Sequence, residues 1–324
     1  MILILTKNND GSSNRIIDWL CHYGKKFIRV NGNDESTKII EINSNQILIE
    51  QNGAIYDLLQ CDSLWYRRNS FSTLSFGIKM KNSVVENVLE GDRDYAKKQL
   101  LSESNVLVDY LHYLIESHIE KRFGGYFTTD VNKLIVLEKA EKIGLKITTN
   151  FILSAREKLY ETIQQNGNLI TKALDNGVYA IKKKHGYYSY TERVNLEDVD
   201  RFSNSFFPSL LQKEIKKKYE LRVFFLAGRF YSTVIFSQKN KTTSIDSRKH
   251  SKDPSRTLPY QLPEEIENKL SILMRELGLN MGSIDIIVDQ QGEYVFLEVN
   301  PVGQFSFYSN KCNYHLEREL ARLL

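Results

Sequence analysis

The chain has 324 residues, with 41% hydrophobic and 26% charged side chains and a formal net charge of +4. This length allows two domains or one elaborate domain, and the composition is that of a globular protein, which excludes intrinsic disorder. No apolar run approaches the roughly 18 residues that a membrane-spanning helix needs, so we expect no membrane partner. The mild positive charge does not by itself indicate nucleic acid, and it fits a protein that binds an anionic ligand in one basic cleft.

Three cysteines, Cys21, Cys61 and Cys312, are widely spaced and form neither a disulfide framework nor a zinc-binding pattern. A reducing cytoplasm is therefore the expected location. The N-terminal apolar stretch is too short for a signal peptide, so we interpret it as a first strand. The sequence contains neither a P-loop motif nor a dinucleotide-binding glycine motif.

The first third of the sequence predicts an α/β unit, because short apolar runs alternate with a segment of helical periodicity. A polar stretch of helical pattern follows from about residue 84 to 123, with one long helix over 94–118. The elements expected before it are strands at 1–5, 27–30 and 63–67, a helix around 16–20, and a hairpin over 38–57.

The middle third predicts a second α/β unit. Residues 132–143 form a helix that ends at Gly144, and residues 147–152 are extended. Ser154 begins another helix, with Glu157 completing a capping-box pattern. Further strands are expected at 168–173, 178–181 and 187–194.

The last third predicts two hairpins and two helices. Each hairpin has a turn motif at its centre, Ala227-Gly228-Arg229 in the first and Asp289-Gln290-Gln291-Gly292 in the second. The expected elements are strands at 220–226, 230–237, 283–288 and 293–299, a polar loop over 239–256, and helices over 262–277 and 315–324.

The second hairpin carries the strongest chemical signal. Asp285 lies on its first strand, and Glu298 and Asn300 point to one face of the second strand because they are two residues apart. Asp285 can face them across the ladder. Two carboxylates and an amide oxygen are ligands suited to a Mg²⁺ ion that bridges phosphates. The alternative is an exposed hairpin with solvated acids, which the apolar context of both acids disfavours.

Several cationic positions could contact a polyphosphate. Lys133 and Lys172 lie in apolar context, where a lysine needs an anionic partner. Taken alone, each is better explained as an ordinary helix or strand lysine. Glu220 and Arg222 share one face of a strand, where they could contact ribose and phosphate or form a cross-strand ion pair.

Other charged segments are weaker signals. Arg67 and Arg68, at the end of a strand, could line a cleft or close a sheet. The run 213–218 could attract an acidic peptide, although such a run is usually a solvated face. A nucleic-acid partner would rest only on this run and on 182–185, and we expect none; a salt titration of binding tests this.

Taken in order, these segments resemble the ATP-grasp superfamily over essentially the whole chain. SLWYRR (63–68), together with ELRV, IFSQ, SIDSR and LEVNPVGQF, is more specifically similar to the peptide-modifying ligases of the graspetide type. These are the microviridin ligases and, most closely, the grasp-with-spasm peptide maturases. The segments that carry the resemblance are Asn132-Lys133, GLKITTN (144–150), LITKAL (169–174), residues 211–238, SIDSR (244–248), SIDIIVD (283–289) and FLEVNPVGQF (296–305).

This resemblance implies an α/β (α+β) chain with the ATP-grasp fold. It places an N-terminal pre-ATP-grasp α/β domain at 1–118, a central lid domain at 119–210 and a C-terminal antiparallel-sheet ATP/Mg domain at 211–324. The hinge reads Gln-Lys-Glu where relatives commonly have Gln-Glu-Tyr, and the lid around 175–186 is rich in lysine rather than glycine.

The resemblance also implies residue roles. Lys133, Lys172 and Arg222 match phosphate-binding residues, Glu220 the ribose ligand, and residues 212–216 the hinge that holds adenine. The implied nucleotide-binding residues are Lys133, Lys172, Gln212, Lys213, Glu214, Ile215, Glu220, Arg222 and Asn300; the implied metal ligands are Asp285, Glu298 and Asn300; the implied catalytic residues are Arg222, Arg248 and Asp246.

The activity implied is that of an ATP-dependent ligase with two Mg²⁺ ions and a ribosomal precursor peptide, built of leader and core segments, as its partner. Asp or Glu side chains of the peptide are activated as acyl phosphates and closed into esters with Ser or Thr, or amides with Lys, releasing ADP and phosphate. Residues 182–190 are a candidate leader-binding surface, and a homodimer is left open. The alternatives are a ligase that adds amino acids to a peptide or protein, and a peptide-binding protein with a degenerate nucleotide site.

Overall fold

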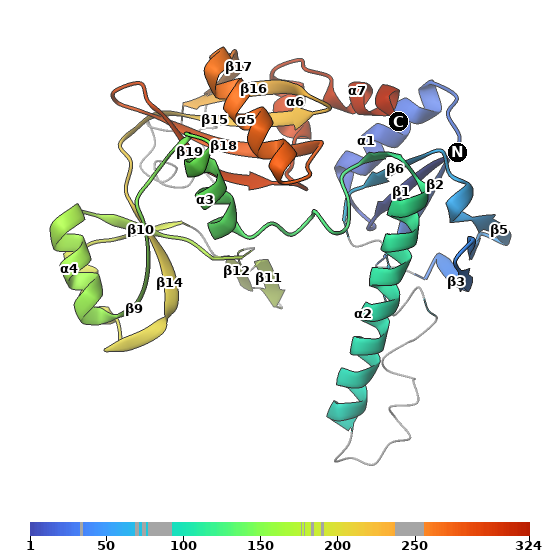
Figure 1. Cartoon of the computed structure of the whole chain (residues 1–324), viewed down its shortest axis with the longest axis horizontal. Helices are drawn as coiled ribbons and strands as arrows, with labels where there is room; N and C mark the ends of the chain where they lie inside the picture. Colours follow the sequence, from blue (N-terminus) through green and yellow to red (C-terminus); the bar gives the residue numbers. More distant parts are fainter. Residues whose placement is uncertain are drawn as a thin grey trace. The chain divides into compact units, whose positions relative to one another are not determined.

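The computed structural model describes residues 1–32, 35–68, 71–72, 76, 93–175, 177, 179–182, 185–188, 191–236 and 256–324 (Figure 1). The chain divides into two compact units. We call Met1–Thr129 with Pro301–Asn310 and Tyr314–Leu324 the terminal unit, and Asp130–Asn300 with Lys311–Asn313 the central unit. No described helix is both long and apolar enough to cross a membrane.

A parallel sheet forms the centre of the terminal unit, in the order β2-β1-β6-β7. Every residue of β1 is buried, as expected for a parallel strand that is covered on both faces. Asp10 caps the helix that follows, because its side chain accepts a hydrogen bond from the backbone N–H of Ser13 at 2.9 Å. The bounds are β1 (Ile2–Thr6), α1 (Gly11–His22), β2 (Phe27–Asn31), β6 (Ser63–Tyr66) and β7 (Lys121–Phe123).

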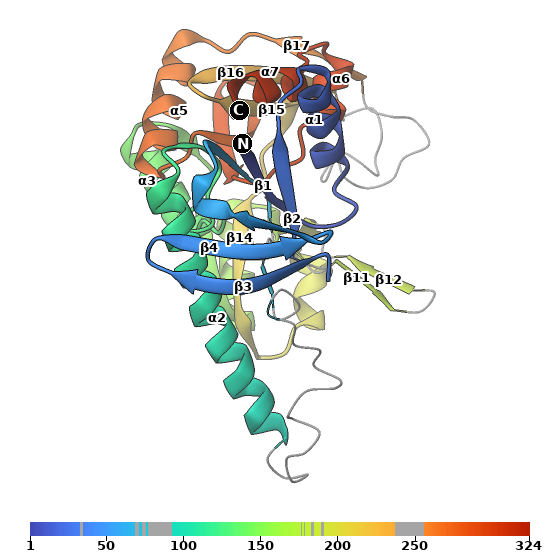
Figure 2. The same ribbon diagram turned by 90° about the vertical axis from the view of Figure 1, so that its right-hand side faces the viewer.

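In its described residues, the rest of the terminal unit adds a small antiparallel sheet, three α-helices and one short 3-10 helix. Figure 2 shows β3 and β4 as neighbouring arrows. The long helix predicted at 94–118 is confirmed, but the helical expectation up to residue 123 is wrong. Residues 121–123 pair with β6 instead, and this pairing buries Phe123. The bounds are β3 (Thr37–Asn43), β4 (Gln46–Gln51), β5 (Ala54–Asp57), η1 (Leu58–Gln60), α2 (Arg93–His118), α6 (Ser306–Lys311) and α7 (Leu316–Leu323).

The central unit is built on a six-stranded sheet in the order β17-β16-β15-β18-β19-β8. Both hairpins predicted in the last third are confirmed as β15–β16 and β18–β19. Arg256, predicted as the end of a loop, is instead the first residue of an edge strand. The bounds are β8 (Lys146–Ile147), β15 (Lys217–Leu226), β16 (Arg229–Phe236), β17 (Arg256–Tyr260), β18 (Met281–Asp289) and β19 (Tyr294–Asn300).

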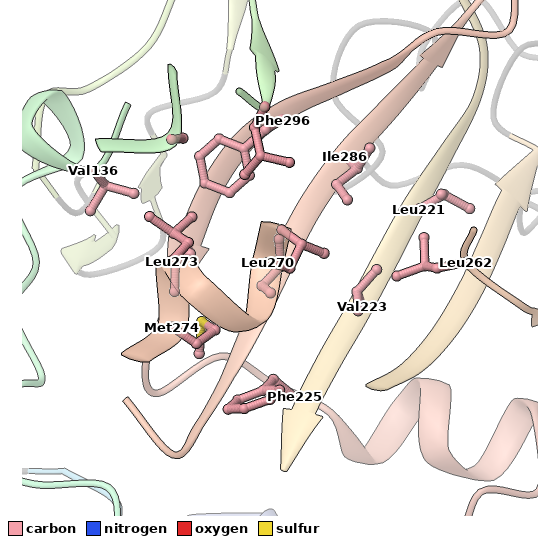
Figure 3. Packing of buried hydrophobic residues seen from close by; sticks show 14 of the residues in the cluster. Val136, Leu221, Val223, Phe225, Leu262, Leu270, Leu273, Met274, Ile286 and Phe296 are labelled. Carbon is pink, nitrogen blue, oxygen red and sulfur yellow. The ribbon is translucent and has the colours of Figure 1, made fainter. Parts of the chain in front are cut away.

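Two helices, α3 (Lys133–Lys142) and α5 (Glu264–Glu276), bury one face of this sheet. Figure 3 shows Leu270 and Met274 of α5 packed toward Val223 and Ile286 of the strands. Because successive strand residues point to opposite faces, the residues between these apolar ones lie on the other face of the sheet. That second face carries the polar residues singled out by the sequence.

A second, four-stranded sheet has the order β13-β10-β14-β9, and α4 packs on it around Leu159 and Ile163. The predicted helix start at Ser154 is wrong, since β9 continues through Ala155 by pairing with β14 and the helix cap has no side-chain hydrogen bond. The bounds are β9 (Asn150–Ala155), α4 (Arg156–Asn166), β10 (Leu169–Thr171), β13 (Glu192–Val194), η4 (Leu196–Arg201) and β14 (Ser205–Lys213).

Two of the predicted strands are each divided between two elements of the structure. Residues 147–152 are divided between β8, which joins the six-stranded sheet, and β9, which joins the second sheet. Residues 187–194 are divided between β13 and the hairpin β11 (Tyr179–Lys182) and β12 (His185–Tyr188). In both cases the apolar pattern predicts extended backbone, but it does not reveal which sheet each half joins.

Candidate active site

Three neighbouring strands bring an arginine and two carboxylates into one row. In the strand register, Arg222 of β15 pairs with Asp285 of β18, which in turn pairs with Glu298 of β19. Arg222 Nε lies 2.8 Å from Asp285 Oδ1. The predicted approach of Asp285 to Glu298 across the hairpin is therefore confirmed. Asn300 follows two residues later on the same strand, opposite Ser283.

Two lysines from outside the sheet reach the same carboxylate. Lys172 Nζ, just after β10, donates to Glu298 Oε2 at 3.3 Å, and Lys133 Nζ lies 4.0 Å from that oxygen. Lys133 also donates to the backbone carbonyl of Asp175 at 2.9 Å. Both lysine side chains are largely covered, with 14% and 22% of their surface exposed. The structure thus brings Lys133, Lys172 and Glu298 together from α3, the second sheet and the main sheet.

The charges of this cluster shift the pKa values of its acids in opposite directions. Burial raises the pKa of Asp285 to about 6; Arg222 opposes this shift, and the neighbouring carboxylates of Glu298 and Glu220 reinforce it. Burial also opposes the ionisation of Glu298, but Lys172 and Lys133 outweigh it and lower its pKa. Burial is thus the main reason that the carboxyl group of Asp285 resists ionisation, whereas Glu298 is held ionised by its two lysines.

Glu220 lies two residues before Arg222 on β15, so both side chains point to the same face of the sheet. Its carboxylate accepts a hydrogen bond from Lys217, whose side chain is only 7% exposed. The sequence placed Lys217 in a basic run expected to be a solvated face, and this expectation is wrong for that residue. Lys217 is buried because it belongs to β15, where it lies opposite Asp289 in the strand register and its ammonium group pairs with the carboxylate of Glu220.

The predicted hinge lies where β14 runs into β15. The backbone N–H groups of Lys213 and Glu214 donate to Thr149 and Asn168, and the Lys213 carbonyl accepts from the Thr148 hydroxyl at 2.8 Å. The Glu214 carboxylate is bound by Arg193 at 2.8 Å.

Two other hinge positions differ in their environment. Gln212 is buried and donates to the side chain of Asn150 at 2.5 Å. Within the described residues, the backbone of Ile215 makes no hydrogen bond, so its N–H and C=O are the hinge groups available to a planar base.

The remaining predicted residues, Asp246 and Arg248, lie outside the described residues, as does part of the predicted lid over 175–186. The side chains of the candidate leader-binding segment 182–190 are likewise outside them.

The donor set fits a hard divalent cation. No group of three His, Cys, Asp or Glu side chains with metal-binding geometry occurs among the described residues. The candidate site instead offers two carboxylates, Asp285 and Glu298, and the amide oxygen of Asn300 on adjacent strands. Oxygen ligands of this kind suit Mg²⁺, which keeps several waters and is completed by substrate phosphates.

Comparison with known proteins decides the fold. No family model matches the sequence, and no curated protein does. A RiPP-associated ATP-grasp ligase from Chryseobacterium gregarium, solved with ADP and a leader and core peptide, superposes with a TM-score of 0.79 at 23% identity over 99% of this chain and 94% of that one. Macrocyclase MdnC from Microcystis aeruginosa MRC, bound with precursor peptide MdnA, gives 0.77 at 25% identity over 100% and 99%. The chain has the ATP-grasp fold.

Within this ATP-grasp fold the similarity is stronger to peptide-modifying enzymes than to a ligase of another kind. D-alanyl-alanine synthetase A from Vibrio cholerae covers 99% of the chain with a TM-score of only 0.57 at 15% identity. The expected resemblance to ATP-grasp ligases of the graspetide type is therefore confirmed in the structure.

Proposed function

We propose that this ATP-grasp chain is an ATP- and Mg²⁺-dependent ligase that closes side-chain macrocycles in a ribosomal precursor peptide. The observation that carries the proposal is the convergence of Lys133 and Lys172 on Glu298, beside the Arg222–Asp285 pair. In its ATP-grasp neighbours, structures were solved with ADP, Mg and a minimal precursor. We propose that Lys133, Lys172 and Arg222 bind the nucleotide phosphates, and that Asp285, Glu298 and Asn300 bind the metal.

The proposed reaction has two steps. A carboxylate oxygen of an Asp or Glu side chain in the peptide attacks the γ-phosphorus of ATP, the bond to the β-phosphate oxygen breaks, and ADP leaves. A Ser or Thr hydroxyl, or a Lys amine, then attacks the acyl carbon, phosphate leaves, and the proton of the nucleophile passes to solvent. The peptide loses one water for each ring.

The described residues contribute positioning and electrostatics, which dominate phosphoryl transfer. Lys172, Lys133 and Arg222 supply three positive charges that can spread the charge of the transferring phosphoryl group. Asp285, Glu298 and Asn300 would hold two Mg²⁺ ions, which supply charge neutralisation on the β- and γ-phosphate oxygens. Glu220 would accept from the ribose hydroxyls, and Ile215 would present its backbone to adenine.

We also propose the division of the chain into an N-terminal pre-ATP-grasp domain at 1–118, a central domain at 119–210 that carries the lid and the candidate peptide-binding surface, and a C-terminal ATP-grasp catalytic domain at 211–324. Arg248 is proposed to act on the γ-phosphate or the acceptor carboxylate, with Asp246 assisting proton transfer. A homodimer in the reducing cytoplasm is the proposed assembly, and its mass in solution tests it.

The deciding experiment is the intact mass of a candidate precursor after incubation with the full-length protein, ATP and Mg²⁺. The candidate is a small peptide rich in Thr, Ser, Lys, Asp and Glu encoded beside this gene. We expect stepwise losses of about 18 Da, one water for each ester or amide formed. Glu298→Gln, which keeps the shape but loses the charge, should abolish these losses.

The matched control is Glu293→Gln, because Glu293 belongs to the same hairpin but is 61% exposed and 3.9 Å from Lys146 rather than in the cluster. This variant should remain active. A gain of mass would instead indicate amino-acid addition. An unchanged peptide in the presence of bound ATP would contradict the ligase proposal and favour a binding protein.

A further inference from the structure

Arg67 and Arg68 form a second charged cluster, which lies wholly within the terminal unit and has no part in the proposed phosphate site. Both guanidinium groups approach one carboxylate, because Arg67 Nε and Arg68 Nε lie 3.6 and 3.5 Å from Asp10 Oδ2. Arg67 and Asp10 are buried, with 1% and 3% of their side chains exposed, whereas 24% of Arg68 is exposed. Arg67 and Asp10 therefore form the buried end of the cluster, and Arg68 forms the end at the surface.

The positive charge of this cluster exceeds its negative charge by one. In the described part of the chain, Asp10 is the acid within ion-pair distance of either arginine. The other partners are neutral backbone carbonyls: Val302 accepts from Arg67 at 2.5 Å and from Arg68 at 3.3 Å, and Gly303 accepts from Arg67 at 3.3 Å. Burial lowers the pKa of Arg67 only to about 10, so it remains charged at neutral pH.

The donors of the cluster are not all used. Arg67 Nη2 is buried and has no hydrogen-bond acceptor among the described residues. Arg68 Nη1 donates to none of them either, and Arg68 is the residue that solvent can reach. An anion from solvent can reach Arg68, where it would accept a charge-assisted hydrogen bond and balance the excess positive charge of the cluster.

A neutral donor lies at the same end of α1. Gln304 is exposed, and its amide oxygen accepts from the hydroxyl of Ser12 at 3.2 Å, while Ser12 itself is buried. Hydrogen bonding through the oxygen leaves the amide nitrogen of Gln304 as a donor. Ser12 binds Gln304, and Asp10 pairs with Arg68. Because Ser12 and Asp10 are two residues apart at the start of α1, Gln304 and Arg68 both lie at this end of the helix.

The position of the cluster in the fold is one that often binds ligands. Arg67 and Arg68 follow the carboxyl end of β6, and Asp10 and Ser12 follow the carboxyl end of β1 in the same parallel sheet. Ligands of open α/β sheets bind outside the carboxyl ends of the strands. In the sequence, Val302 comes only two residues after Asn300, the last of the candidate metal ligands.

From this geometry we infer that Arg68, with Gln304, binds a carboxylate side chain of the substrate peptide. This inference rests on the proposed function, since a peptide whose Asp and Glu side chains are consumed presents several carboxylates to the enzyme. Arg67 and Asp10 are positioning residues: Asp10 orients both guanidinium groups, and Arg67 fixes the segment that carries Gln304 through Val302 and Gly303.

The test measures binding of an acidic peptide under conditions in which no phosphoryl transfer can occur. Isothermal titration of the full-length protein, at low salt and without nucleotide, compares acetyl-Thr-Glu-Thr-Glu-amide with the same peptide containing Gln in place of Glu, and with inorganic phosphate. We expect the acidic peptide alone to bind, and Arg68→Gln to weaken it at least about tenfold, as for a lost hydrogen bond to a charged group.

Arg15→Gln is the matched control, because it removes the same charge from an arginine on α1 that is 50% exposed. Equal weakening by Arg15→Gln and Arg68→Gln would overturn the inference in favour of a general charge effect. Equal binding of the Gln peptide, or Arg68-dependent binding of phosphate, would overturn the carboxylate assignment. Ring formation is scored separately: if no ring forms but Arg68-dependent binding persists, the proposed function fails and the carboxylate site stands.

Discussion

Arg222 and Asp285 lie directly opposite each other on β15 and β18, with Nε and Oδ1 2.8 Å apart. Glu298 lies on the far side of Asp285, and Lys172 and Lys133 both reach Glu298, so one arginine and two lysines flank two adjacent carboxylates. The two central carboxylates repel each other, and the flanking cations do not remove that repulsion. A divalent cation beside Asp285 and Glu298 would do so, and this expectation leads to the first two predictions.

Binding of Mg²⁺ should weaken as the pH falls through 6. The pKa of Asp285 is raised to about 6, whereas that of Glu298 is lowered, so Asp285 is the ligand that takes up a proton first. Because the metal requires the ionised carboxylate, the affinity should fall about tenfold between pH 7 and pH 5. Titration calorimetry of the nucleotide-free protein at both pH values measures this. An affinity that does not change would show that Asp285 is not a ligand.

Lys172→Met should slow phosphoryl transfer while leaving the fold intact. The side chain retains its length and apolar character but loses the charge that lies 3.3 Å from Glu298. Removing one preorganised charge from such a site typically costs roughly 10²-fold in rate. The readout is ADP release in the presence of precursor.

Lys158→Met is the control for this variant. Lys158 is 64% exposed and, among the described residues, forms its ion pair with Glu161 on the surface of α4. It should leave the rate of ADP release unchanged. If both lysine variants reduce the rate equally, the effect is one of overall charge and Lys172 has no special role.

Asp10→Asn should destabilise the protein at neutral pH and much less in acid. Burial opposes ionisation of Asp10, but Arg67, Arg68 and Ser13 lower its pKa below the usual 3.8. The stabilisation from the carboxylate is therefore complete above pH 3.8 and is lost as the pH falls through the lower pKa of the folded state. Asparagine still caps α1, so the variant isolates the charge.

At pH 7 we expect a loss of about 3 kcal/mol in the free energy of unfolding, the usual cost of leaving a buried charge without its partner. Urea unfolding at pH 7 and at several values below 3.8 measures the difference between variant and wild type. Asp18→Asn makes the same change at an exposed position of α1 and should have no effect. A difference that stays constant with pH would show that the Asp10 charge does not stabilise the fold.

Leu270→Ala should destabilise the central unit by about 2–5 kcal/mol, since it leaves a cavity between α5 and the six-stranded sheet. Leu270 is fully buried among strand residues such as Val223 and Ile286 (Figure 3). Ile272→Ala, on the same helix but 37% exposed, should change the free energy of unfolding by only about 0.5 kcal/mol. Thermal unfolding of both variants tests the assignment of the buried face.

Much of the fold could be predicted because its elements have local signals. The Asp289-Gly292 turn and the flanking apolar runs predicted the β18–β19 hairpin and the approach of Asp285 to Glu298. Ser154 shows the limit of such signals: a capping pattern was present, but pairing with β14 extended the strand through Ala155 instead. Local propensity is weak against the pairing of a whole strand.

Contacts between distant segments could not be predicted from single-sequence patterns. Lys172 and Glu298 are 126 residues apart, and no periodicity relates them. Lys217 was hidden in a run of lysines, and only its strand register shows that it is buried beside Glu220. Arg67 was seen to end a strand, but its bond to Val302 depends on the return of the chain 235 residues later.

The terminal unit takes its residues from both ends of the chain, and this affects its synthesis. Leu316 and Leu320 of α7 are buried, α7 packs on α1, and Ser63 and Lys25 donate to the backbone carbonyls of Leu324 and Ala321. The ribosome makes β1 and α1 well before it makes α7, which packs on α1. The terminal unit therefore cannot be completed until the central unit has been translated, and deletion of residues 315–324 would leave α1 without this cover.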